Sequence, residues 1–144
     1  MRGVLLTSGV RGIGTYCMNL HNELLAKGHD VLLVSERKWE KTLPASFFQA
    51  KSVVLLGVVP IVYKPAEAMR AILAFKPDLI HSHWPSGKMA YFLKRFEELR
   101  APVLTTIHVS LASRDNILDK VWYHYFSRLK KWIPGVDMIN CISG

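Results

Sequence analysis

The chain has 144 residues, and 19 lysines and arginines against 11 aspartates and glutamates give it a net charge of +8. Half of the residues are hydrophobic, which excludes a disordered tail, and the length predicts a single domain spanning residues 1–144. The only two cysteines, Cys17 and Cys141, are too few for a disulfide scaffold or a four-cysteine zinc site, so we expect reduced, buried thiols. The longest apolar run, residues 53–59, is too short to span a membrane, and we expect a cytoplasmic protein.

The first half of the chain alternates short apolar runs with helical patterns. Residues 4–6 predict a buried strand, and a glycine-rich turn follows at residues 8–14. A helix comes next, ended by Gly28, with apolar residues at helical spacing at Tyr16, Leu20, Leu24 and Leu25. We then expect a strand at residues 31–34, a loop at 36–50 and a third strand at 53–56.

The second half continues the same alternation. Pro65 predicts the start of a helix that runs to Phe75, and residues 77–81 predict a fourth strand. Further helices at residues 85–99 and 116–132 flank a fifth strand at 102–107, and a sixth strand is expected at 136–142. Six continuous apolar strands with helices between them predict a doubly wound parallel sheet of the Rossmann-like α/β class, with helices on both faces.

In such a sheet, ligands bind beyond the carboxyl ends of the strands. The turn after the first strand holds Gly9, Gly12 and Gly14, which suits an anion at a helix N-terminus, although a plain tight turn explains the glycines too. The turn is not the dinucleotide fingerprint, because Cys17 stands where its third glycine should be. The second strand also ends in Ser35 rather than an acid, and Glu36 comes only after it. It is not a Walker A loop either.

Histidines and a tryptophan follow the fourth and fifth strands. His81 and His83 are two residues apart and point the same way; they suit a metal less well than one core and one cleft-facing imidazole, because no third ligand stands at a typical spacing. Trp84 offers a stacking surface for a sugar or base, or else packs at a helix entry. His108, after the fifth strand, either donates to a substrate hydroxyl or is structural.

Four segments together resemble a known family. They are residues 11–31, 76–83, 102–108 and 137–143, and their order and spacing resemble the N-terminal domain of GT-B glycosyltransferases of family 4. The resemblance implies a retaining enzyme that moves a sugar from a nucleotide-sugar donor to a sugar or lipid-linked acceptor. It implies no cofactor and no metal, with most of the donor held by a C-terminal domain or a donor-binding subunit that residues 1–144 do not include.

The resemblance also implies roles for particular residues. His108 would contact the transferred sugar as the catalytic residue, and Gly12, Ile13 and Gly14 would lie against the donor diphosphate and the acceptor. The acceptor pocket would be shaped by a further set of residues, namely Tyr16, His83, Trp84 and Ser110. The alternative to a transferase is a Rossmann-like module that binds a dinucleotide or another anion.

Basic residues gather on two of the expected helices. One group comprises Lys120, His124, Arg128, Lys130 and Lys131, and the other comprises Lys88, Lys94, Arg95 and Arg100. They form either ordinary solvated faces or a surface that holds the protein at the inner face of an anionic membrane. We expect no nucleic-acid partner, because no helix-turn-helix, zinc-finger or RNA-recognition pattern is present.

Overall fold

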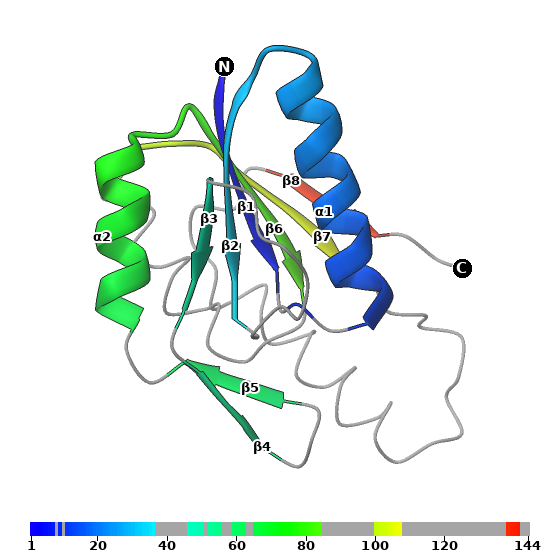
Figure 1. The fold of residues 1–144 in the computed structure, drawn as a ribbon, viewed down its shortest axis with the longest axis vertical. Coiled ribbons are helices and arrows are strands. Elements are labelled where there is room, and N and C mark those ends of the chain that lie inside the picture. Colours follow the sequence, from blue (N-terminus) through cyan, green and yellow to red (C-terminus); the bar gives the residue numbers. More distant parts are fainter. Residues whose placement is uncertain are drawn as a thin grey trace.

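The computed structural model describes residues 1–7, 9, 11–36, 46–50, 52–55, 59–62, 65–84, 100–107 and 138–141. In these residues a six-stranded sheet carries one helix on each face (Figure 1). The strands of this sheet, in chain order, are β1 (Arg2–Thr7), β2 (Asp30–Ser35), β3 (Phe47–Gln49), β6 (Leu79–Trp84), β7 (Val103–Ile107) and β8 (Met138–Cys141). The two helices are α1 (Arg11–Ala26) and α2 (Pro65–Phe75), and β4 (Ser52–Leu55) and β5 (Val59–Val62) form a separate pair.

The order of the strands in the large sheet is β3-β2-β1-β6-β7-β8, and all five pairings are parallel. The chain therefore builds outward from β1 through β2 to β3, and then returns to the other side of β1 with β6. The predicted doubly wound, Rossmann-like α/β fold is confirmed. Its order reverses between β1 and β6, which is the point where open sheets of this class bind their ligands.

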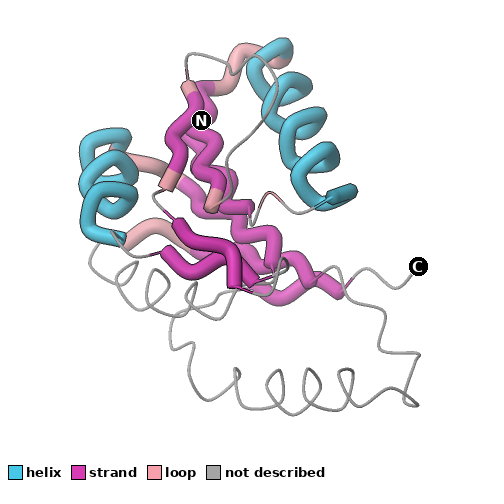
Figure 2. Tube along the Cα trace, turned by 60° about the horizontal axis from the view of Figure 1, so that its bottom comes forward, coloured by secondary structure: helices cyan, strands magenta, loops and turns pink. Residues whose placement is uncertain are grey.

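The two faces of the sheet are covered by different helices because successive strand residues point to opposite sides. Leu5 packs with Cys17 of α1, whereas its neighbours Val4 and Leu6 pack with Ile72 of α2. Each helix supplies a stripe at helical spacing: α1 gives Ile13, Cys17, Leu20 and Leu24, and α2 gives Ala68, Met69, Ile72 and Phe75. Figure 2 shows α1 and α2 apart from each other, with the strands between them.

Gly28 ends α1 as predicted. Its φ of +78° lies in the left-handed region, its amide donates to the carbonyl of Leu25 (2.9 Å), and the amide of His29 donates to that of Leu24 (3.0 Å). These two bonds form a Schellman motif, which satisfies carbonyls that the helix itself leaves without donors.

The third strand of the sheet was predicted at the wrong position in the sequence. The expected strand at residues 53–56 overlaps β4, but β4 pairs antiparallel with β5 outside the main sheet. The third strand of the sheet is β3, inside the expected loop at 36–50, and it pairs with β2. Antiparallel pairing needs only a short connection, whereas parallel pairing needs a long crossover, so two apolar runs close together in sequence pair with each other.

Two boundaries also differ from those expected. Helix α1 begins at Arg11, so Gly12 and Gly14 lie in its first turn rather than in a loop. Strand β6 runs on to Trp84, so His83 and Trp84 belong to the strand and not to the turn after it. The helices expected at residues 85–99 and 116–132 lie outside the described residues.

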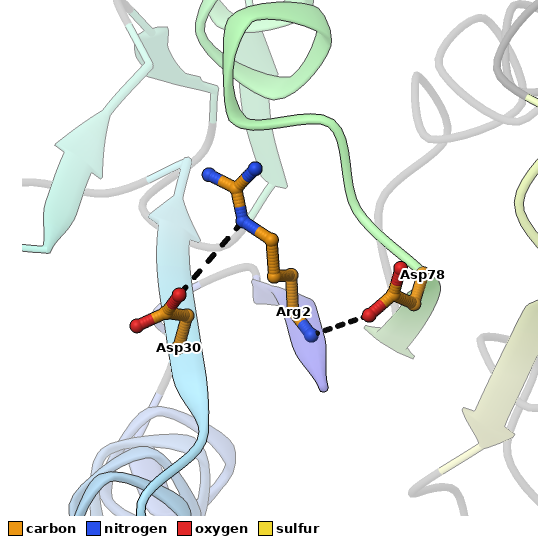
Figure 3. A network of polar contacts seen from close by, with 3 residues as sticks. All are labelled: Arg2, Asp30 and Asp78. Atoms are coloured by element: carbon orange, nitrogen blue, oxygen red, sulfur yellow. Dashed lines mark hydrogen bonds and ion pairs between the residues drawn. The ribbon is translucent and has the colours of Figure 1, made fainter.

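Polar contacts at the amino ends of the strands hold the opposite edge of the sheet together (Figure 3). The backbone amide of Arg2 donates to the carboxylate of Asp78 (2.7 Å), and the Arg2 guanidinium lies 3.9 Å from a carboxylate oxygen of Asp30. The same guanidinium lies 4.7 Å from the ring centre of Phe75. This cluster joins β1, β2 and the segment before β6, and it lies at the edge away from the carboxyl ends of the strands.

Candidate functional site

A row of polar residues crosses the sheet at its carboxyl edge. The pairing registers align one polar position from every strand: Gln49, Ser35, Thr7, His83, Thr106 and Asn140, in the order of the sheet. We call these six positions the polar row. Within it, the residues of the four central strands are almost wholly buried, from 0% exposed at Thr7 and His83 to 2% at Thr106.

The central residues of the polar row, Thr7 and His83, lie on the α1 face of the sheet. The hydroxyl of Thr7 is hydrogen-bonded to the thiol of Cys17 on α1, and it accepts a hydrogen bond from the amide of Gly9 (3.1 Å). His83, the next residue of the row, contacts Tyr16, which also belongs to α1. The centre of the row, at Thr7 and His83, thus lies beneath the first half of α1, at the reversal point of the sheet.

Three aromatic rings lie one against the next at the centre of this site, with neighbouring rings tilted by 59° and 43°. The ring centres of Tyr16 and His83 are 5.3 Å apart, and those of His83 and His81 are 3.9 Å apart. Nε2 of His81 shares a hydrogen bond of 2.8 Å with the hydroxyl of Thr106. We call Tyr16, His83 and His81 the ring stack. Tyr16 is 44% exposed, His83 is fully buried and His81 is intermediate in exposure, so Tyr16 is the most exposed member of the stack.

The first turn of α1 follows β1 at the same edge of the sheet. Gly9, with a φ of +67°, lies between β1 and the helix, and no acidic residue occurs in the first turn. The first N–H groups of a helix have no partner within it and carry a partial positive charge, which favours an anion. Gly12 is exposed and a Cβ there would meet no atom, whereas Gly14 is buried and Ile13 packs into the α1-side core.

The structure brings together some predicted site residues and leaves others undescribed. Gly12, Ile13, Gly14 and Tyr16 share the first half of α1, and His83 lies beneath Tyr16. Trp84 ends β6, one residue beyond the polar row. His108 and Ser110 lie outside the described residues, as do the basic residues of both predicted groups apart from Arg100, which is exposed.

Sequence reasoning missed several members of the site. Ser35 and Thr106 form part of the polar row, and the signal that could have found them is a polar residue at the carboxyl end of an apolar strand. Glu36 directly follows β2; it is 3% exposed, and its amide donates to the carbonyl of Thr7 (3.0 Å). A buried acid therefore stands immediately beyond the second strand. The sequence shows Glu36 after Ser35, but no pattern in it indicates that this acid is buried.

The thiol of Cys17 is buried, as expected, and burial raises its pKa to about 11. It is therefore a neutral packing group and no nucleophile at physiological pH. In the described ranges, the two histidines of β6 gather no third histidine, cysteine or carboxylate into a potential metal site. Neither described helix is long and apolar enough to cross a bilayer.

Comparisons with known proteins bear on this geometry. The model of the family described as Glycosyltransferase Family 4 matches residues 10–144. Among solved structures, an alpha-glucosyltransferase in complex with UDP and a 13-mer DNA containing a central A:G mismatch is similar, with a TM-score of 0.60 and 15% identity. That match covers 98% of this chain and 37% of the glucosyltransferase.

A second solved structure, a short-chain dehydrogenase/reductase SDR from Burkholderia vietnamiensis, is similar with a TM-score of 0.50 and 12% identity. That match covers 99% of this chain and 83% of the dehydrogenase. At these identities both likenesses show the shared fold alone. No curated protein matches significantly.

Proposed function

Because the chain belongs to glycosyltransferase family 4, we propose that it forms the acceptor-side domain of a retaining enzyme that transfers a sugar from a nucleotide-sugar donor. The observation that carries the proposal is the family match across residues 10–144, and the location of the polar row supports it. Exposed Tyr16 and the amides at the start of α1 lie at the reversal point of the sheet, next to the end of β7, and substrates of such sheets bind there.

Glycosyl transfer needs groups that stabilise negative charge, and the start of α1 offers such groups. Cleavage of a sugar–phosphate bond leaves negative charge on the diphosphate, and helix amides with their partial positive charge stabilise such an anion. In the proposal, the amides around Gly12, Ile13 and Gly14 contact the diphosphate, and His108 orients a hydroxyl of the transferred sugar. No metal or cofactor is required, and closure of a second domain over the site excludes water, the competing acceptor.

The acceptor side of the proposal is formed by Tyr16, Trp84 and Ser110. The ring of Tyr16 is the exposed end of the ring stack and suits the apolar face of a sugar. His83 is buried beneath Tyr16, so we assign it the support of that ring rather than direct contact with the acceptor. The acceptor is a sugar or a lipid-linked sugar, and the excess positive charge supports peripheral binding to anionic membrane from the cytoplasm.

The proposal is tested on the complete natural protein with a panel of nucleotide sugars, following release of the nucleoside diphosphate. We expect His108→Ala to lower transfer by orders of magnitude at an unchanged Tm. His29→Ala is the matched control, because His29 lies before β2 at the opposite edge of the sheet, and it should leave the rate unchanged. Full activity of His108→Ala would contradict the role of His108.

Glu36 favours a second candidate, a dinucleotide-binding domain. Dinucleotide-binding sheets use an acid near the end of the second strand to hold a ribose, and Glu36 occupies that place. A titration with NAD(H) separates the two functions. Saturable binding that Glu36→Gln weakens, without release of diphosphate from any nucleotide sugar, would establish this candidate in place of the transferase.

A further inference from the structure

The ring stack connects the two segments that carry the proposed site. Tyr16 belongs to α1, which holds the amides proposed to meet the diphosphate, and Thr106 lies near the end of β7, two residues before His108. Between them stand His83 and His81, both on β6. Any group that fixes the positions of α1 and β7 relative to β6 therefore fixes the amides of α1 relative to the end of β7.

His81 makes the connection to β7 by a diagonal contact. In the sheet register His81 lies beside Leu104, and His83 lies beside Thr106. The imidazole of His81 nevertheless reaches the hydroxyl of Thr106 at 2.8 Å, which lies two residues farther toward the carboxyl edge. The diagonal reach brings its ring against that of His83, which explains the separation of 3.9 Å between the ring centres.

The burial of His83 and Thr106 indicates that they support the site and do not bind substrate. His83 and Thr106 are 0% and 2% exposed, so neither presents a surface to a substrate. His81 is intermediate in exposure, but its Nε2 is occupied by the hydrogen bond with Thr106. A metal at that nitrogen would have to displace the hydroxyl. Buried hydrogen-bonded groups of this kind hold neighbouring elements in one arrangement.

We propose that His81 is a positioning residue for glycosyl transfer, acting through Thr106 on the end of β7 and through His83 on Tyr16. The inference rests on the proposed function, since it concerns the same site. It assigns to His81 no contact with substrate. A loss of the bond displaces the segment that leads into His108, and displacement of a reacting group by about 1 Å can lower a rate by about 100-fold.

Thr106→Val tests the bond, because it removes the hydroxyl at nearly constant volume. Thr105→Val is the matched control: Thr105 is the neighbouring residue of β7, is 5% exposed, and its hydroxyl has no hydrogen-bond partner. In the complete protein we expect Thr106→Val to lower kcat by about 10- to 100-fold with KM for the donor nearly unchanged, and Thr105→Val to change neither. A kcat of Thr106→Val equal to that of the wild type, or an equal loss of kcat in both variants, overturns the proposal.

A second pair of variants decides the matter if Thr106→Val does not fold. The amide nitrogen of Gln can occupy the position of Nε2, so His81→Gln should retain most of the kcat that His81→Ala loses. Equal losses in these two variants overturn the proposal.

A readout without activity separates this inference from the proposed function. Histidine ring nitrogen shifts report the tautomer, and we expect the His81 signal to change in Thr106→Val and to stay unchanged in Thr105→Val. If the wild-type protein transfers sugar from no nucleotide donor, the proposed function fails, and this positioning role fails with it. If transfer occurs but the His81 signal is insensitive to Thr106→Val, only the positioning role fails.

Discussion

Cys17 allows a quantitative test of how α1 packs on the sheet. Its thiol is 0% exposed, lies among apolar side chains and is hydrogen-bonded to Thr7 at the polar row. Desolvation by burial raises its pKa from an ordinary 9.0 to about 11, and the bond to Thr7 opposes only part of that rise. Between about pH 9 and pH 11 the native protein therefore keeps a thiol proton that the unfolded chain has lost.

The sign of the effect on stability follows from this difference. Below pH 9 both states hold the proton and Cys17 contributes no pH dependence. Between pH 9 and 11 the unfolded chain binds fewer protons than the native protein, so the free energy of unfolding falls as pH rises. With these two pKa values the loss at pH 10.5 is about 2 kcal/mol.

Urea unfolding at pH 8 and pH 10.5 measures this loss. Wild-type Cys17 and Cys17→Ala are compared in a Cys141→Ala background, so that Cys17 is the only thiol within residues 1–144. Lysines and tyrosines also titrate in this range, but they do so equally in both proteins and cancel in the comparison. An identical pH dependence in the two proteins, or rapid reaction of native Cys17 with a thiol reagent at pH 8, would refute the packing of α1 described above.

Three further substitutions probe the fold. Gly28→Ala should lower the free energy of unfolding by about 1–2 kcal/mol, because φ at this position is +78° although the new Cβ meets no atom. Gly12→Ala is the control, measured in the same chemical unfolding experiment. Its Cβ is equally unobstructed but lies in the helix α1, so it should cause no loss. Arg2→Ala should lower it by about 1 kcal/mol or less, because its ion pair is exposed, and should leave kcat unchanged, because Arg2 lies at the edge away from the site. Ile72→Ala should lower it by about 2–5 kcal/mol, because Ile72 is fully buried between α2 and the sheet; a value below 1 kcal/mol would contradict that packing.

Most of the sheet could be predicted from the sequence because its strands are continuous apolar runs. A strand buried on both faces needs apolar side chains on both, as in Val31–Val34, and this pattern differs from that of a helix. Helix α2 was predicted at both ends, since Pro65 fits the first turn and Phe75 is the last member of its apolar stripe.

The misplaced third strand shows where such reasoning fails. Strand β3 has only three residues, two phenylalanines and a glutamine, so it offers no period to detect. The stronger apolar run at β4 pairs with β5, a few residues away, and is not part of the six-stranded sheet. Pairing between strands distant in sequence is decided by the whole fold, and no local pattern in residues 46–62 specifies it.

The candidate site was predictable in its residue types and less so in its arrangement. The alternation of strand side chains placed His81 and His83 on one face, and the structure confirms this with a ring separation of 3.9 Å. Their connection to Thr106 and Tyr16 depends on the register between strands and on the position of α1. Neither can be read from the spacing of residues along one segment.

The polar row has a consequence for folding as well as for binding. Buried polar groups are costly unless they are hydrogen-bonded, and Thr7 and Thr106 find such partners on the α1 face in the thiol of Cys17 and the imidazole of His81. A slip of one residue in β1 would replace Thr7 by Leu6 on this face and separate its hydroxyl from the thiol of Cys17. The same slip in β6 would replace His83 by Ser82 and remove the ring beneath Tyr16. The side chains that we place in the candidate site therefore also favour the one register in which that site forms.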